Sequence, residues 1–318
     1  MQAVILSAGR GTRLMPITEN RTKAMCPVAG KPIVERVMDT LVANGISEFI
    51  LVISPDDPEI VEYFENKSKI EARVQFVHQA KQLGMGHALL QAVPYIHDDF
   101  ILSSCDNLVE EVVILRMLSM WTSDPPPNGI LTLIRVGPDE IIRMGVVEIT
   151  NKQRIIRIVE KPTLEEAPSD IGSVPIYLFS HKLIEYLNKI KPSARGEYEL
   201  QDAVQELIEN DGDVYGLLLP NRIDLTHPVD LLRLNLLFLV KDPPQREVHP
   251  DNIGNGTRFI DPVKIDKDVT IGSDCIIGPN VYIESGAIIG DGVNLENSVV
   301  LRESKVRSGT KVREKVIW

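Results

Sequence analysis

A six-residue period runs through the C-terminal part of the chain. Large aliphatic residues recur at every sixth position, at Ile265, Ile271, Ile277, Ile283, Ile289, Leu295 and Leu301. Small or branched residues stand four places after the first six, at Val269, Cys275, Val281, Ala287, Val293 and Val299. This period is typical of a left-handed parallel β-helix, in which each short strand forms one side of a triangular coil. Residues 257–318 suffice for about three coils, near the minimum for a repeat array, so we expect another surface to cap them.

The preceding residues, 1–240, predict an α/β domain because short apolar strands alternate with amphipathic helices. Strands are expected at 3–6, 49–53, 73–78 and 100–103, with helices at about 32–41, 59–65 and 86–92 between them. Such units form a mostly parallel, Rossmann-like sheet with a ligand crevice at the carboxyl ends of its strands. Longer apolar strands between residues 130 and 179 predict antiparallel additions. Further helices are expected at 183–189, 200–209 and 229–240, a strand at 214–219, and a linker at 241–256.

Composition argues against several classes of protein. The chain has 318 residues, 43% hydrophobic and 25% charged, which suits one or two globular domains. It shows neither a long apolar run nor a signal-like N-terminus, so we expect a cytoplasmic protein without a membrane partner. Its three cysteines lie far apart, which argues against disulfides and a zinc site. The formal net charge of −11 repels polyanions, so no nucleic-acid partner is expected.

The segment SAGRGTR, residues 7–13, follows the first predicted strand and differs from this acidic average. Glycines there let backbone amides approach an anion, and nearby basic side chains add positive charge. Five basic residues stand against one acidic residue between positions 7 and 31: Arg10, Arg13, Arg21, Lys23 and Lys31. The third glycine of a dinucleotide-binding fingerprint is missing, and no Gly-Lys-Ser/Thr of a P-loop follows. The segment therefore predicts a phosphate-binding loop of another kind.

At this point the chain resembles the sugar-1-phosphate nucleotidyltransferases of the glucose-1-phosphate thymidylyltransferase and uridylyltransferase type. The opening motif consists of Gly9, Gly11, Thr12, Arg13, Pro16, Thr18, Lys23, Pro27, Lys31 and Pro32. Later segments match in the family's order: QAKQLGMGHAL (79–89), CDN (105–107), MGVVEI (144–149), EKP (160–162), RGEYELQDAV (195–204) and RIDLTHPVDLLRLN (222–235). The resemblance covers roughly residues 1–238, and family members with a C-terminal hexapeptide-repeat β-helix account for the rest.

The resemblance implies a reaction in which a phosphate oxygen of a sugar 1-phosphate attacks the α-phosphorus of a nucleoside triphosphate. Pyrophosphate leaves, and a nucleotide sugar remains. The implied substrates are UTP or dTTP and a hexose 1-phosphate, with glucose 1-phosphate as the first expectation. Such a displacement needs charge neutralisation and alignment more than a protein nucleophile. The implied cofactor is Mg²⁺, and the implied assembly is a homo-oligomer formed through the β-helix.

The resemblance also assigns roles to residues of this chain. The implied catalytic set is Arg13, Lys23 and Asp106, of which Arg13 and Lys23 would bind the triphosphate. Asp106 and Asp224 would hold Mg²⁺, a hard cation that suits carboxylates. The implied nucleotide-binding residues are Leu6, Ala8, Gly9, Gly11, Thr12, Gln79, Gln82 and Gly84. The implied sugar-phosphate-binding residues are Gly145, Glu160, Lys161 and Glu197.

Two alternatives stay open. The chain departs from the family pattern at Cys105, Ser173, Val174, Pro175 and Arg222. These departures leave room for a non-catalytic regulatory subunit that binds a nucleotide sugar. The other alternative is an N-acetylhexosamine-1-phosphate uridylyltransferase. Acetyl transfer in its β-helix would want a histidine base, but the last histidine, His249, precedes the repeats.

Overall fold

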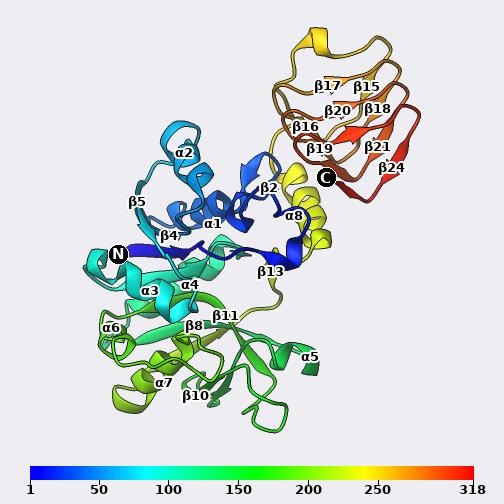
Figure 1. Cartoon of the computed structure of the whole chain (residues 1–318). Coiled ribbons are helices and arrows are strands. Elements are labelled where there is room, and N and C mark those ends of the chain that lie inside the picture. The colour runs from blue at the N-terminus through cyan, green and yellow to red at the C-terminus, as the bar shows by residue number, and fades with distance from the viewer. The chain divides into compact units, whose positions relative to one another are not determined.

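The computed structural model describes all 318 residues, which group into two compact units. The first unit contains residues 1–9 and 37–223, and the second contains residues 10–36 and 224–318. Figure 1 labels the elements of both. The predicted division at residues 240 and 257 follows chain order, whereas the contacts group residues 10–36 with the C-terminal part of the chain.

A nine-stranded sheet forms the framework of the first unit. Its main path runs in the order β10 (Ile155–Glu160), β9 (Gly145–Ile149), β11 (Ile171–Phe179), β6 (Phe100–Ser104), β1 (Gln2–Leu6), β4 (Glu48–Ile53) and β5 (Arg73–His78). Off this path, β8 (Gly129–Arg135) pairs with β11, and β12 (Val214–Leu218) pairs with β8. The β1, β4, β5 and β6 strands are parallel, whereas β11 runs antiparallel to β6, β8 and β9. The predicted parallel core with antiparallel additions is confirmed.

Helices cover this sheet with their apolar sides. They are α2 (Pro58–Asn66), α3 (Met85–Ala92), α4 (Glu111–Trp121), α5 (Pro138–Ile141), α6 (Leu183–Leu187) and α7 (Leu200–Asn210), while α1 (Ile33–Val42) begins in the second unit and ends in the first. The sequence prediction missed α4. Its sequence, EVVILRMLSMW, is apolar on most sides, although only Ile114, Met117 and Trp121 are buried. A helix with so little polar contrast gives a weak period, which explains the omission.

A topological switch point lies between β1 and β6. The chain leaves β1 toward β4 on one side and leaves β6 toward the antiparallel strands on the other. Leu6 pairs with Ser104, so the loops that follow these two strands begin side by side. Open α/β sheets bind ligands at such a point, beyond the carboxyl ends of the strands.

Three parallel sheets form the C-terminal coils of the second unit (Figure 1). The first sheet contains β14 (Gln245–Arg246), β16 (Val263–Ile265), β19 (Val281–Ile283), β22 (Ser298–Val300) and β25 (Val316–Ile317). The second contains β15 (Arg258–Phe259), β18 (Ile276–Ile277), β21 (Asn294–Glu296) and β24 (Lys311–Arg313), and the third contains β17 (Thr270–Ile271), β20 (Ile288–Ile289) and β23 (Lys305–Val306). Val263 lies opposite Val281, eighteen positions later, which equals three six-residue sides. The β-helix prediction is confirmed.

Two positions of the repeat prediction, Val299 and Leu301, are wrong, and Val281 pairs with Ser298 instead of Val299. Ile283 pairs with Val300, seventeen positions later, and Val300 rather than Leu301 joins the interior cluster of the coils. The shortened corner follows Leu295, where Asn297 adopts a positive φ of 45°. A strict six-residue count cannot register a corner that is one residue shorter, so the predicted series runs one place too far at its end.

The loop of residues 10–36 and the helix α8 (Pro228–Lys241) complete the second unit. The loop contains η1 (Thr12–Leu14), η2 (Lys23–Met25), β2 (Pro27–Val28) and β3 (Lys31–Pro32). The helix contacts β2 of the loop and β19, β22 and β25 of the coils. The predicted linker, 241–256, contains β14 and the short η4 (Pro250–Asn252), and β14 joins the first sheet of the coils.

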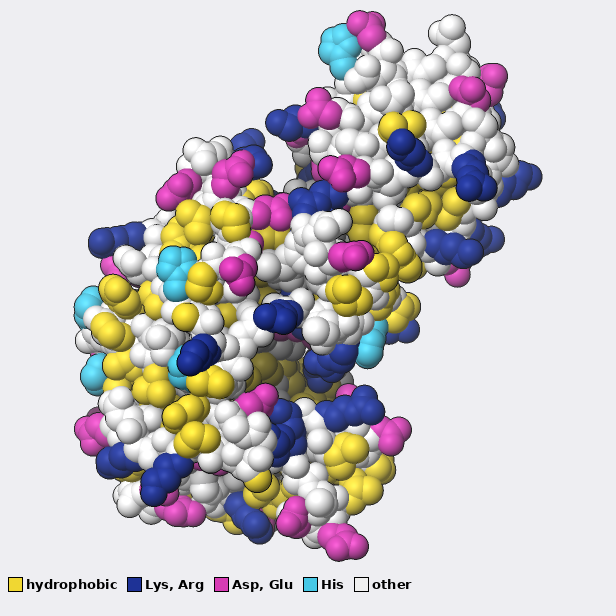
Figure 2. Space-filling view, viewed as in Figure 1, with side chains coloured by type: hydrophobic (Ala, Val, Ile, Leu, Met, Phe, Trp, Pro, Cys, Tyr) yellow, Lys and Arg dark blue, Asp and Glu magenta, His cyan; other side chains and the backbone are white.

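Charge is distributed unevenly over the surface. Between residues 302 and 315, six basic residues stand against two acidic ones. Figure 2 shows basic side chains gathered over the coils near β24, while both signs mix over the rest of that face. None of the helices combines the length and the apolar character that crossing a membrane requires.

Candidate active site

Two loops of the first unit start at the switch point and are fixed by their backbones. The Ser7 amide donates to the Val52 carbonyl at 2.8 Å, and the Cys105 amide donates to the Leu6 carbonyl at 3.2 Å. Asp106 follows with a buried side chain, and the side-chain Nδ2 of Asn107 lies 3.5 Å from the Asp106 Oδ1. The structure thus brings Asp106 to the carboxyl end of β6, next to the loop that contains Ala8 and Gly9.

The segment between β5 and α3 contacts this first loop. The Gln82 Nε2 donates to the Ala8 carbonyl at 2.5 Å. Gln79 is buried, and its Nε2 donates to the Gly84 carbonyl at 3.2 Å and lies 3.0 Å from His87 Nδ1. Burial lowers the pKa of His87, which favours a neutral ring that can accept from this amide. Three of the residues predicted to bind the nucleotide therefore lie together with Ala8.

Gly84 permits a close approach between this segment and a distant one. Its φ is +97°, and a Cβ there would lie 2.8 Å from the Tyr198 carbonyl oxygen. Two backbone hydrogen bonds join the segments, from the Tyr198 amide to the Leu83 carbonyl at 2.8 Å and from the Gly86 amide to the Tyr198 carbonyl at 2.9 Å. A side chain at Gly84 would force these two segments apart. Glu197, which is predicted to bind the sugar phosphate, is thereby fixed beside the segment Gln79–Gly84.

Three predicted sugar-phosphate residues form one charged cluster. Lys161 Nζ lies 3.5 Å from Glu160 Oε1 and 3.4 Å from Glu197 Oε2. Its backbone has a positive φ of 47°, and its amide donates to the Met144 carbonyl at 3.1 Å. The turn after β10 therefore directs Lys161 toward both carboxylates.

Glu160 is the most perturbed acid of this cluster. Its side chain is 11% exposed, and its Oε2 is buried with no hydrogen-bond partner in the protein. Burial raises the pKa of Glu160 to about 7, although the Lys161 charge partly opposes this effect. Buried carboxylate oxygens are almost always hydrogen-bonded, so this oxygen is an acceptor available to a ligand.

Gly145 and the atypical segment at 173–175 complete this side of the site. Gly145 pairs with Glu160 across β9 and β10, and a Cβ there would lie 2.8 Å from Ser173 Oγ. Ser173 Oγ accepts from the Tyr177 hydroxyl at 3.0 Å. The register of β11 shifts between Val174 and Tyr177, so the departure from the family pattern coincides with a backbone irregularity beside the cluster. The sequence marked Ser173 as a departure from the family pattern, whereas nothing in the motifs singled out Tyr177.

The remaining predicted residues belong to the second unit. Gly11 adopts a φ of +65°, and a Cβ there would lie 2.9 Å from the Lys23 Cβ, so the loop folds back on itself. The Thr18 hydroxyl donates to the Gly11 carbonyl at 2.8 Å. Thr12 and Arg13 form the exposed start of η1. This fold brings Gly11 and Lys23 together.

Asp224 lies at the end of β13 (Ile223–Asp224), just before α8. Its Oδ2 accepts from the Thr226 hydroxyl at 2.5 Å. Asp230 caps the helix by accepting from the amides of Thr226 at 3.1 Å and His227 at 2.7 Å. Asp224 is therefore not the residue that caps α8.

Each of the two carboxylates predicted to hold Mg²⁺ is chemically suited to a metal ion that is bound together with a substrate. No group of three or more His, Cys, Asp or Glu side chains in the structure could hold a metal ion by itself. Mg²⁺ in nucleotide enzymes is commonly bound by one or two carboxylates and by substrate phosphates. Asp106 in the first unit and Asp224 in the second each offer hard oxygen ligands of this type.

Comparison with protein families identifies the class. The sequence model described as Nucleotidyl transferase matches residues 2–236, and the model described as GMPPB C-terminal domain matches residues 259–318. The first match covers well over half of the chain. The chain therefore belongs to the nucleotidyl transferase family.

Curated relatives have names consistent with this class. A bifunctional protein GlmU of Methanococcus maripaludis (strain C7) is 39% identical over 76% of this chain, which is 55% of that protein. UTP–glucose-1-phosphate uridylyltransferase AglF of Haloferax volcanii is 31% identical over 72% of this chain and 93% of that protein. A glucose-1-phosphate thymidylyltransferase of Streptomyces griseus is 33% identical, over 77% of this chain and 68% of that protein. The chain spans about half the length of the first of these relatives.

Solved structures share the fold. A UTP-bound UGPase from Acinetobacter baumannii has a TM-score of 0.66 and 25% identity, over 76% of this chain and 94% of that chain. A UDP-glucose pyrophosphorylase complexed with UDP-glucose has a TM-score of 0.67 over 76% of this chain and 99% of that chain. Its identity of 22% supports the fold alone.

Proposed function

We propose that this protein transfers a nucleotidyl group from UTP or dTTP to a hexose 1-phosphate, with glucose 1-phosphate as the first candidate, and releases pyrophosphate. The observation that supports this most is the cluster of Glu160, Lys161 and Glu197, because backbone hydrogen bonds join it to the Gln79–Gly84 segment within one unit. A site of this composition offers a cation for a phosphate and acceptors for sugar hydroxyls, beside residues suited to a nucleotide.

Glu160 would bind the sugar. Its buried Oε2 lacks a partner in the protein, so a sugar hydroxyl that donates to it would satisfy an otherwise costly buried acceptor. Lys161 lies between two carboxylates, which fix its ammonium group, and it would orient the sugar phosphate. Gly145 would contribute through its backbone, because Ser173 and Gln201 already fill the space in which a side chain would stand.

The chemistry requires alignment and neutralisation of charge. The attacking phosphate is already an anion at neutral pH, so no general base is needed. Arg13 and Lys23 would bind the triphosphate and oppose the charge that develops on the leaving pyrophosphate. Mg²⁺ held by Asp106 and Asp224 would supply further neutralisation of the phosphate oxygens. We also propose that the protein forms a homo-oligomer through its coils, which light scattering would measure.

A second candidate is the same transfer with an N-acetylhexosamine 1-phosphate as acceptor. The first relatives are named bifunctional GlmU, and their matches include the part of the chain that contains the Glu160 cluster.

The test is pyrophosphate release by the purified full chain with Mg²⁺. A grid of ATP, GTP, CTP, UTP and dTTP against several hexose and N-acetylhexosamine 1-phosphates identifies both substrates. We expect one strong combination, with UTP or dTTP, and no release by the Asp106→Asn variant, which should fold normally. Release by the Asp106→Asn variant would overturn the metal assignment. If the wild-type protein releases no pyrophosphate in any combination but still binds a nucleotide, the regulatory subunit would be favoured.

A matched pair of lysine variants tests the sugar site. Lys161→Met should raise the KM for the sugar phosphate at least about tenfold, or about 1.4 kcal/mol of transition-state stabilisation, and leave the KM for the nucleotide within about twofold. Lys182→Met is the control, because Lys182 forms an exposed ion pair with Asp211 at 3.2 Å in the same unit. Equal effects of the two variants would contradict the assignment of Lys161.

A further inference from the structure

The loop that contains Lys23 is anchored by the β-helix. Arg21 has a side chain that is only 4% exposed and forms a bidentate ion pair with Glu284, at 2.7 Å from Nη1 to Oε1 and 3.0 Å from Nη2 to Oε2. Glu284 follows β19 and is itself 13% exposed. Bidentate guanidinium–carboxylate pairs fix orientation as well as distance. The pair thus joins positions 263 residues apart in the sequence.

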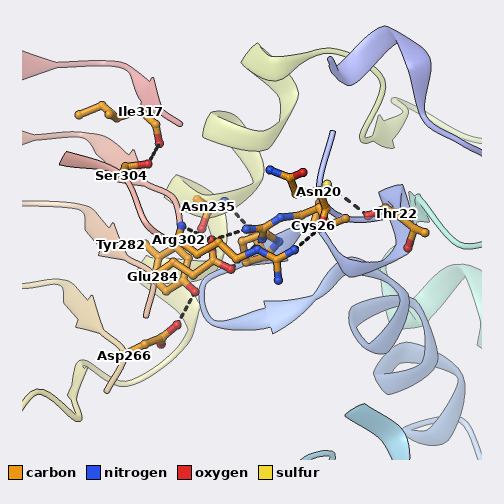
Figure 3. A network of polar contacts seen from close by, with 12 residues as sticks. Asn20, Thr22, Cys26, Asn235, Asp266, Tyr282, Glu284, Arg302, Ser304 and Ile317 are labelled. Carbon is orange, nitrogen blue, oxygen red and sulfur yellow. Dashed lines mark hydrogen bonds and ion pairs between the residues drawn. The ribbon is translucent and has the colours of Figure 1, made fainter. Parts of the chain in front are cut away.

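A second coil strengthens this anchor. The Arg302 backbone amide donates to Glu284 Oε2 at 2.8 Å, and the Arg302 guanidinium donates to the Asn20 carbonyl. In Figure 3, Glu284 and Arg302 point from the coils toward the loop beside Asn20. Two residues before Glu284, the Tyr282 hydroxyl donates to Asp266 Oδ2 at 2.6 Å. Two successive coils therefore bind two successive residues of the loop, Asn20 and Arg21.

The other end of the same segment is held by α8. The Asn235 side chain is fully buried, accepts from the Ala29 amide at 2.7 Å, and donates to the Pro27 carbonyl at 3.0 Å. Lys23 lies between these two anchors, at the start of η2 and against Gly11. The hydrogen bonds from Asn235 of α8 reach Pro27 and Ala29, whereas those from the coils reach Asn20 and Arg21, on the side of the segment nearer in sequence to Lys23.

We propose that Glu284 and Arg302 are positioning residues, through which the β-helix sets the place of Lys23 for the triphosphate. This inference rests on the proposed function for the role of Lys23. A loop that is ordered before binding spares the ligand the entropic cost of ordering it. A misplacement of about 1 Å in a group that aligns a substrate costs about a hundredfold in rate. The β-helix would then act on the reaction without touching a substrate.

The experiment is a double-mutant cycle between Glu284→Gln and Lys23→Met. Its readouts are the Kd for the nucleoside triphosphate, measured by calorimetry without sugar phosphate, and, where turnover is present, the kcat/KM for that triphosphate. Glu284→Gln should weaken both at least about tenfold in the wild-type background and less than about twofold in the Lys23→Met background. Equal losses in the two backgrounds would overturn the proposal, because they would mean that Glu284 does not act through Lys23.

Glu296→Gln is the matched control. Glu296 belongs to the same coils and forms an exposed ion pair with Arg313 at 3.5 Å, away from the loop. It should leave Kd and kcat/KM within about twofold of the wild type. A loss equal to that of Glu284→Gln would show a general effect of the coils and would overturn the proposal. Arg302→Met is the second variant, which leaves the Arg21–Glu284 pair in place and should give a smaller loss of the same kind.

Hydrogen exchange separates this inference from the proposed function. Glu284→Gln should speed amide exchange at residues 21–26 in the ligand-free protein and leave the amides of α8 unchanged. If the wild-type protein shows no turnover in any substrate combination, the proposed function fails, and the exchange experiment still decides whether the β-helix orders the loop. Unchanged exchange at residues 21–26 would overturn the inference whatever the activity of the wild-type protein.

Discussion

The burial of Glu160 should make the stability of the first unit depend on pH. Burial raises the pKa of this carboxyl from its ordinary value of 4.5 to about 7, the charges of Lys161 and Arg195 oppose the rise, and the charge of Glu199 adds to it. The folded protein therefore keeps a proton on Glu160 over a pH range in which the unfolded chain has lost it. Stability must fall as the pH rises through that range, because the folded state binds the extra proton.

The magnitude follows from the pKa difference. A difference of about 2.5 between folded and unfolded states corresponds to about 3 kcal/mol of unfolding free energy, at about 1.36 kcal/mol per pH unit. The side chain is 11% exposed, so solvent screening reduces this figure little. The stabilising contribution is fully present below about pH 4.5 and is lost as the pH rises through about 7. Glu160→Gln removes the titrating group and should remove this pH dependence.

The assay is urea unfolding at several pH values between 5 and 8, followed by tryptophan fluorescence. Trp121 is buried in the first unit and reports its unfolding, whereas Trp318 is 57% exposed already in the folded protein. We expect the unfolding free energy of Glu160→Gln, relative to that of the wild type, to rise by about 2–3 kcal/mol between the lowest and the highest pH. Glu197→Gln is the control, because it removes a 40% exposed carboxylate from the same Lys161. Parallel stability curves for wild type and Glu160→Gln would refute the reasoning.

Three further experiments test other parts of the structure. Asn235→Ala removes three buried hydrogen bonds, two between α8 and the loop at Pro27 and Ala29 and one within α8 to Leu231, and should cost about 2–4 kcal/mol in thermal unfolding; a loss below about 1 kcal/mol would contradict this. Gly278→Ala places a Cβ 1.9 Å from the Ile260 carbonyl oxygen at a φ of +115° and should melt the coils at a much lower temperature by circular dichroism, whereas Gly292→Ala, with open space around it, should cost about 1 kcal/mol. Burial raises the pKa of the Cys26 thiol to about 12, so iodoacetamide at pH 8 should label it, by mass spectrometry, only after unfolding.

Short-range periods made most of the fold predictable. The alternation of strands and helices up to residue 103 and the antiparallel strands after residue 130 match the observed elements closely. The hexapeptide period predicted the coils because each of its members is buried for the same geometric reason. The period failed only where geometry changed, at the corner that puts Val300 instead of Leu301 inside. The omission of α4 has the opposite cause, since its sequence contains too little contrast to show a period.

The candidate site was predictable as a set of residues and not as an arrangement. Motif order selected Glu160, Lys161 and Glu197, and the structure places the Lys161 ammonium within 3.5 Å of a carboxylate oxygen of each glutamate. The burial that leaves Glu160 Oε2 without a partner depends on strands that are distant in sequence, so no local pattern contains it. The contact between Gly84 and Tyr198 joins segments more than a hundred residues apart. The roles of these residues in binding stay predictions.

The basic residues between positions 10 and 31 differ in their surroundings although they look alike in sequence. Five of them suggested an anion site, yet Arg21 is neutralised by Glu284, and Lys31 lies 3.5 Å from Glu35. An arginine whose charge is already paired and buried adds little attraction for a triphosphate, because its Coulomb field is largely cancelled by its partner. Arg13, by contrast, is exposed on η1. Counting charges in the loop therefore overstates the field that a ligand meets, and the buried pair is better understood as the means by which a distant β-helix fixes where the remaining charges stand.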